Sequence, residues 1–130
     1  MNWKQIAGYA TCLVLSEVVI GFLQGYFGPD LPAKAMSLAS LFASLVAFIA
    51  IFAHMTSRQS DRPFSHATLA AIASIAAPIL VLSIFPVTRD RLELSSALVG
   101  IATIAAAISP GALIGNYLRD RRRPSPLPIA

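Results

Sequence analysis

Glu17 is the residue whose type and position most directly suggest chemistry. It lies near the middle of an apolar stretch that runs from Ile6 to Phe27, about 16 Å along a helix that rises 1.5 Å per residue. An acidic side chain at the centre of a membrane helix costs about 2.5–3.5 kcal/mol on insertion scales, and such residues commonly mark proton or substrate pathways. Glu17 is therefore the first candidate for a proton or substrate site.

The surroundings of Glu17 define what its carboxyl group can do. No Lys or Arg lies near the middle of any apolar stretch, so the carboxyl must hold a proton, reach water through a cavity, or meet a cation from outside the chain. On an ideal helix Gly21 and Gln24 share its face, which gives a stripe of small and polar residues. The stripe either lines a narrow cavity or packs against another helix. In the second case a protonated Glu17 would hydrogen-bond to a hydroxyl group, with these candidates: Ser44, Ser74, Thr103 and Ser109.

No other group of residues has the pattern of a catalytic or metal site. Cys12 has no base nearby, and Ser16 points about 100° away from Glu17 around the helix. His54 and His66 flank one loop, but two histidines alone make a weak metal site. The sequence therefore predicts a protein that is not an enzyme and that binds no metal or cofactor.

The composition predicts a membrane protein. Hydrophobic residues make up 56% of the chain and charged residues only 12%, whereas soluble domains contain about 25% charged residues. The mean hydropathy is +0.70. Lipid must therefore cover much of the surface. The net charge of +4 comes from basic residues at the ends of apolar stretches, where they favour anionic lipid headgroups as partners and not nucleic acid.

Four apolar stretches are each long enough to cross a hydrocarbon core of about 30 Å, which takes about 20 helical residues. They cover residues 6–27, 31–55, 64–85 and 92–118. We expect an all-α integral membrane protein in which residues 1–123 form a four-transmembrane-helix bundle. Residues 124–130 are rich in proline and predict a flexible tail.

The distribution of Lys and Arg predicts the orientation. The side that holds both termini and the middle loop carries the larger group of basic residues: Lys4, Arg58, Arg62, Arg119, Arg121, Arg122 and Arg123. The other side carries Lys34, Arg89 and Arg91. Because cytoplasmic loops are enriched in Lys and Arg, both termini should be cytoplasmic. We expect the membrane to be a bacterial inner membrane. The cluster of Arg119, Arg121, Arg122 and Arg123 is typical of a topology signal that also contacts lipid headgroups.

Small residues recur at helical spacing and predict close helix packing, within the chain or between copies. Two glycine pairs, Gly21 with Gly25 and Gly111 with Gly115, have the spacing of such contacts. Three stretches also carry small residues on one face: Ala35, Ala39, Ala43 and Ala47; Ala67, Ala70, Ser74 and Ala77; and Thr103, Ala107, Gly111 and Gly115. In the second stretch we expect the alanine face to meet a helix and the larger side chains to meet lipid.

The segment from Ser16 to Gly21 resembles the first-helix signature of the small multidrug resistance exporters, and Arg91–Leu94 followed by Gly100 is similar to the start of their fourth helix. In that family a membrane glutamate binds protons and cationic drugs in turn. The chain departs from the family because its third stretch has no tryptophan and its charged middle loop is longer. Those exporters typically form antiparallel dimers, whereas the charge bias here favours one orientation. The resemblance therefore implies only a role for Glu17, and no family is assigned.

Two functions follow from these features. The first is a non-enzymatic membrane protein that acts through helix–helix association, with a membrane-protein partner or as a homodimer. The alternative is a small proton-coupled transporter in which Glu17, with Gln24 beside it, is the proton and substrate site. A water-accessible cavity at Glu17 would favour the transporter, and a carboxyl packed dry against a hydroxyl would favour association.

Overall fold

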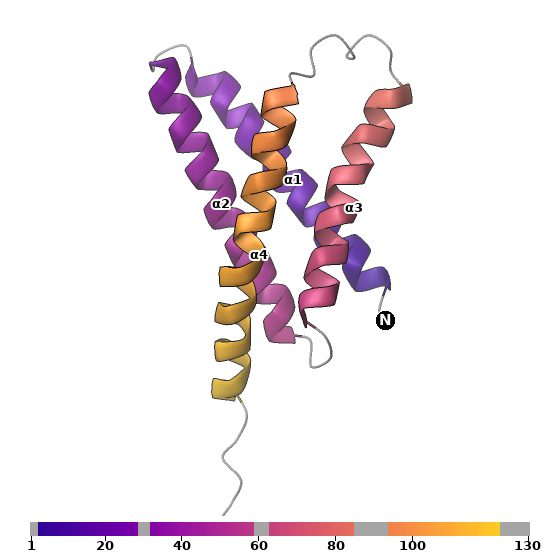
Figure 1. The fold of residues 1–130 in the computed structure, drawn as a ribbon. Helices are drawn as coiled ribbons and strands as arrows, with labels where there is room; N and C mark the ends of the chain where they lie inside the picture. Colours follow the sequence, from indigo (N-terminus) through magenta and orange to yellow (C-terminus); the bar gives the residue numbers. More distant parts are fainter. Residues whose placement is uncertain (1–2, 29–31, 59–62, 85–93, 123–130) are drawn as a thin grey trace, which may run out of the picture.

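A computed structural model describes residues 3–28, 32–58, 63–84 and 94–122. These residues form four α-helices, which confirms the predicted all-α class (Figure 1). The helices are α1 (Trp3–Phe27), α2 (Ala33–Arg58), α3 (Pro63–Ile84) and α4 (Leu94–Arg122). Three segments are long and apolar enough to cross a membrane: Trp3–Phe27, Ala33–Arg58 and Leu98–Arg122. The apolar segment described within α3, Phe64–Ala77, is shorter.

The helices continue beyond the apolar stretches that predicted them. Helix α1 begins at Trp3, α2 extends to Arg58 and α4 extends to Arg122. Hydropathy detects only the part of a helix that contacts lipid, whereas backbone hydrogen bonding continues into the polar interface. Helix α2 begins at Ala33, two residues later than predicted. Pro32 is the residue before the helix, and its carbonyl accepts the first hydrogen bond of the helix, from the Met36 amide at 3.0 Å. The predicted tail, residues 124–130, lies outside the described residues.

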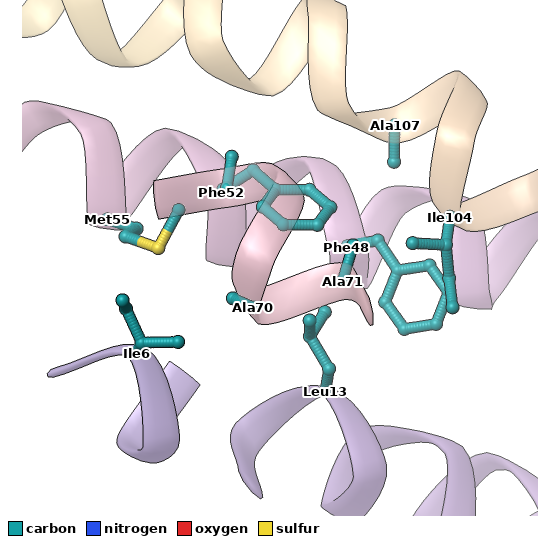
Figure 2. Packing of buried hydrophobic residues seen from close by; sticks show 10 residues of the cluster. Ile6, Leu13, Phe48, Phe52, Met55, Ala70, Ala71, Ile104 and Ala107 are labelled. Atoms are coloured by element: carbon teal, nitrogen blue, oxygen red, sulfur yellow. The ribbon is translucent and has the colours of Figure 1, made fainter. Parts of the chain in front are cut away.

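The core combines large side chains from α2 with small residues from α3 and α4. Phe48, Phe52 and Met55 of α2 are at most 1% exposed. Figure 2 shows residues of the other three helices around them: Ile6 and Leu13 of α1, Ala70 and Ala71 of α3, and Ile104 and Ala107 of α4. The small residues allow the helix backbones to approach the aromatic rings closely.

The closest helix contact joins α2 and α4, which run in the same direction (Figure 1). A Cβ atom added at Gly111 would lie 2.6 Å from the Phe52 Cβ and 3.0 Å from the Ile49 carbonyl oxygen. One added at Gly115 would collide with Thr56 and lie 2.6 Å from the Ala53 carbonyl oxygen. Because any side chain would force the helices apart, this crossing requires glycine at both positions.

The prediction for the faces of α2 is wrong. Ala35, Ala39 and Ala43 are exposed, whereas Phe48 and Phe52, which we expected to meet lipid, are buried. The α4 glycines instead meet the face of α2 that carries Ile49, Phe52, Ala53 and Thr56, with Gly111 against the Phe52 Cβ atom and Gly115 against Thr56. Phe48 and Phe52 are therefore buried in the core with residues of the other helices, such as Leu13 and Ile104. The predicted small faces of α3 and α4 lie in the core in part: Ala67, Ala70, Ser74, Ala107, Gly111 and Gly115 are buried, whereas Ala77 is exposed and Thr103 is half-buried.

We expect Gly115→Ala to destabilise the fold by about 1–3 kcal/mol, the usual cost of inserting a methyl group into a packed core. The melting temperature of the purified protein in detergent measures this effect. Gly25→Ala is the matched control, because nothing lies within 4 Å of its added Cβ and alanine favours the helix by up to about 1 kcal/mol. A Gly115→Ala protein that melts at or above wild type would contradict the close α2–α4 contact.

Candidate functional site

Glu17 continues the inward-facing stripe of α1. The buried residues of this helix are Ile6, Ala10 and Leu13, and Glu17 follows Leu13 by four positions, so it lies on the same face. The structure describes all of α1, and none of its residues after Leu13 is buried. The same face of one helix thus borders a packed core in its first half and open space in its second half.

That open space is a cavity of about 410 Å³ between α1, α2 and α4, which we call the polar cavity. Its polar lining comes from all three helices: Glu17 and Gln24; Ser37, Ser40 and Ser44; and Thr103. Ile20, Gly21, Leu41, Val99 and Gly100 complete it. A carboxyl, an amide and four hydroxyl groups around one space are unusual for surfaces that face lipid, where unpaired polar groups are costly.

Two of the four hydroxyl groups of the polar cavity already donate their hydrogen within their own helix. The Thr103 hydroxyl donates to the Val99 carbonyl at 2.8 Å, and the Ser40 hydroxyl donates to the Ser37 carbonyl at 3.1 Å. Each hydroxyl has one hydrogen, so these two oxygens can only accept a further hydrogen bond. The polar cavity therefore offers oxygen acceptors at these two positions, whereas the Gln24 amide and the hydroxyl groups of Ser37 and Ser44 can also donate.

Four side chains of the polar cavity have no hydrogen-bond partner within the described residues: Glu17, Gln24, Ser37 and Ser44. Ser44 is buried, with 8% of its surface exposed, and its hydroxyl makes no such bond. The Glu17 carboxyl is exposed to the cavity and makes neither a hydrogen bond nor an ion pair with any described residue. Water or a ligand in the cavity can therefore supply hydrogen-bond partners to these groups.

The sequence left two arrangements open for Glu17, a cavity or a packed contact with a hydroxyl group, and the structure treats them differently. Gly21 and Gln24 line the polar cavity with it, as the cavity alternative expects. The hydroxyl partners of the packing alternative do not bond to Glu17 in the described part of the chain. Ser74 instead donates to the Ala71 carbonyl at 2.8 Å, and Ser109 is exposed.

The two glycine pairs lie in different environments. Gly111 and Gly115 lie at the crossing of α4 with α2. Gly21 and Gly25 have nothing within 4 Å of an added Cβ, so neither contacts another described helix at that position. Any close contact that involves Gly21 and Gly25 must therefore come from outside the described chain.

The arginine cluster lies at the end of α4. Arg119, Arg121 and Arg122 occupy its last turn, whereas Arg123 lies outside the described residues. The Arg121 guanidinium lies 4.8 Å from the centre of the Tyr117 ring, and the Arg119 Nε lies 3.6 Å from the Asp120 Oδ1. An Arg on an aromatic face combines charge with apolar surface, which suits the headgroup region of a bilayer.

Sequence reasoning missed Ser37, Ser40 and Gly100 as residues of the site. The spacing of Ser37, Ser40 and Ser44 places them on one face of α2, so the signal was present in the sequence. Gly100 had no such signal, because only the packing of α4 brings it to the cavity. In the described residues no group of three or more His, Cys, Asp or Glu side chains could hold a metal ion.

No known family model matches the chain, and neither a curated protein nor a solved structure is significantly similar to it. The geometry around Glu17 is therefore the main clue to the function of the protein.

We expect water to reach the polar cavity when the protein lies in a bilayer. Thr103→Cys in a Cys12→Ser background should react with a membrane-impermeant methanethiosulfonate reagent in proteoliposomes, because Thr103 lines the cavity. Val19→Cys in the same background is the control, since Val19 is 56% exposed on the surface of α1 and should face lipid. Equal, negligible labelling at both positions would show that the cavity is dry.

Proposed function

We propose that the protein is a small proton-coupled transporter of a bacterial inner membrane, in which Glu17 holds a proton and a small polar solute in turn. The observation that carries this proposal is the polar cavity: the membrane carboxyl lines a space of about 410 Å³. A solute in this space would contact Glu17 directly. A carboxyl in a cavity that admits water can exchange its proton, which a carboxyl packed dry between helices cannot do.

The depth of Glu17 supports a transport role. At 1.5 Å per residue it lies about 21 Å from Trp3 along a helix of about 37 Å, which is close to the middle of α1. A binding site near the midplane can be reached from either side by a modest rearrangement of helices, as in many secondary transporters. In this proposal all four helices span the bilayer.

The distribution of basic residues supports an orientation with both termini in the cytoplasm. Lys4 lies in the first turn of α1, Arg58 in the last turn of α2, and Arg119, Arg121 and Arg122 in the last turn of α4. These ends of the three helices lie at one end of the bundle, whereas Lys34 starts α2 at the other (Figure 1). The positive-inside rule places the arginine-rich end in the cytoplasm, next to anionic lipid headgroups.

We expect Glu17→Gln to reduce proton flux to the level of protein-free liposomes, because glutamine keeps the shape of the side chain but cannot carry a proton. The assay follows the internal pH of proteoliposomes under an imposed potential. Asp120→Asn makes the same carboxyl-to-amide change at an exposed residue at the end of α4 and should keep the wild-type flux. A Glu17→Gln protein with wild-type flux would rule out proton coupling through this residue.

A second candidate function, helix–helix association, is supported by the exposed surface of α1. Gly21 and Gly25 lie on the part of α1 that has no buried residue, and large apolar side chains are exposed beside them: Val18, Val19, Phe22 and Tyr26. A glycine pair four positions apart allows two membrane helices to pack closely. This surface fits a second copy of the chain or another membrane protein.

We expect Gly21→Leu to lower the dimer fraction in detergent, measured by cross-linking, without lowering the melting temperature of the monomer. The reason is that the added side chain meets no described residue of its own chain near its Cβ but would block a close contact between helices. Ala102→Leu, an exposed position on α4, serves as the control. An unchanged dimer fraction would exclude the glycine pair of α1 as an association surface.

A further inference from the structure

A second cavity borders Glu17. It has a volume of about 330 Å³ and is lined by residues of all four helices: Leu13, Val14, Glu17 and Val18; Phe48; Ser74; and Ile104. We call it the apolar cavity, because its only polar residues are Glu17 and Ser74. Glu17 is the residue that it shares with the polar cavity. The two cavities thus meet at the carboxyl group, and the question is which of them connects it with water.

The polar lining of α1, α2 and α4 gives way to apolar side chains at one level of the bundle. About one turn or less from the last polar residue of each helix lies a large apolar one: Leu13 of α1, Phe48 of α2 and Ile104 of α4. We call these three residues the apolar layer. Each is at most 9% exposed, and Figure 2 shows Phe48 beside Ile104, with Leu13 reaching toward them. The layer lies on the side of Glu17 toward the start of α1 and the end of α4 (Figure 1).

The packed core continues from the apolar layer toward that end of the bundle. Ile6 and Ala10 follow on α1, and Phe52 and Met55 follow on α2, and all four are buried. Water is unstable in a narrow apolar constriction, which is how hydrophobic gates in channels close without a plug. This half of the bundle therefore separates Glu17 from the end that holds the arginine cluster.

The apolar cavity gives water no path around this layer. The Ser74 hydroxyl donates its hydrogen to the Ala71 carbonyl at 2.8 Å, and apart from Glu17 the other lining residues are hydrocarbon. A cavity holds water only where two to four polar groups can bind it. We therefore expect the apolar cavity to be dry.

The polar cavity extends toward the opposite end of the bundle. Gln24, Ser37 and Gly100 line it and are exposed. They lie near the end of α1 and the starts of α2 and α4, which Figure 1 shows at one end of the bundle. Access to Glu17 is therefore asymmetric, with polar open space on one side and packed hydrocarbon on the other.

We propose that Glu17 is reached from the non-cytoplasmic side alone in this structure, and that Leu13, Phe48 and Ile104 form a hydrophobic gate that closes the site toward the cytoplasm. This inference rests on the proposed function, because it states how access to the transport site is controlled. A proton or solute enters through the polar cavity, and its release into the cytoplasm requires the apolar layer to separate.

Two serines with nearly equal burial provide a matched test of which cavity is wet. Ser44 lines the polar cavity and is 8% exposed, whereas Ser74 lines the apolar cavity and is 6% exposed. Ser44→Cys and Ser74→Cys are each made in a Cys12→Ser background and treated with a membrane-impermeant methanethiosulfonate reagent in membrane vesicles. We expect Ser44→Cys to react at least about 10-fold faster, because only the thiolate reacts and apolar surroundings suppress it. Thr103→Cys, at a half-buried position of the polar cavity, should react as well.

The side of access is measured with right-side-out and inside-out vesicles. Lys34→Cys and Asp120→Cys, at exposed positions near opposite ends of the bundle, mark the two sides. We expect Ser44→Cys and Thr103→Cys to react at least about 10-fold faster from the Lys34→Cys side, because the apolar layer excludes water on the other. In the proposed orientation this is the outside of the cell.

Polar substitutions test the gate residues themselves. Leu13→Asn places an amide of similar size beside the apolar cavity, so water should enter it and Ser74→Cys should react at least about 10-fold faster. Leu15→Asn makes the same change at a residue that is 56% exposed and should leave Ser74→Cys unreactive. Ile104→Thr, with Ile101→Thr at an exposed position as its control, repeats the test with little change in shape, which guards against misfolding of Leu13→Asn.

The outcomes separate this inference from the proposed function, because labelling does not depend on proton flux. Equal reaction of Thr103→Cys from the two sides, or reaction of neither polar-cavity thiol, would overturn one-sided access. Equal rates at Ser44→Cys and Ser74→Cys, or a Ser74→Cys rate that neither gate substitution raises, would overturn the hydrophobic gate. One-sided labelling together with wild-type flux in Glu17→Gln would leave the gate standing while the proposed function fails, and two-sided labelling with flux lost in Glu17→Gln would do the reverse.

Discussion

The crossing of α2 and α4 at Gly111 and Gly115 determines the rest of the architecture. The two helices run in the same direction and meet closely near their C-terminal ends, where Gly111 and Gly115 lie against the Phe52 Cβ atom, the Thr56 side chain and the backbone of Ile49 and Ala53. The residues that line the polar cavity come from the earlier part of each helix, Ser37 to Ser44 in α2 and Val99 to Thr103 in α4. Close contact at one end and a cavity at the other are therefore properties of the same helix pair.

Helix α1 contributes the carboxyl and amide side chains that make this cavity a candidate site. Its inward face supplies Ile6, Ala10 and Leu13 to the core and then, on the same helical stripe, Glu17 and Gln24 to the polar cavity. The surroundings of this stripe change at Glu17: an apolar cavity and Leu13 lie on one side of it, and the polar cavity lies on the other. Glu17 is therefore the residue of α1 that borders both an apolar and a polar space.

Transport and association draw on surfaces of α1 that overlap at Gly21, which lines the polar cavity, and at Val18, which lines a second cavity beside Glu17. The cavities lie against its inward stripe, whereas Val19 and Phe22 are exposed and line neither of the two cavities that Glu17 borders. Gly21 lines the polar cavity and also leaves room for a helix from outside. A helix that packed against Gly21 would therefore lie at the edge of the cavity, and a second copy of the chain would complete a wall that three helices leave open.

Periodicity and hydropathy by themselves determined a chain of apolar helices with basic ends and one carboxyl at the middle of the first helix. These properties are local: helix length, amphipathic faces and turns follow from residues a few positions apart. The faces that meet were decided only by the tertiary structure. The alanines of α2 had the spacing of a packing face, but α2 turns Phe48 and Phe52 into the core, and its contact with α4 is made at Gly111 and Gly115, far along the chain. The surroundings of Glu17 depended on the same choice of partners, since a stripe on one helix does not specify whether a hydroxyl or an open cavity faces it.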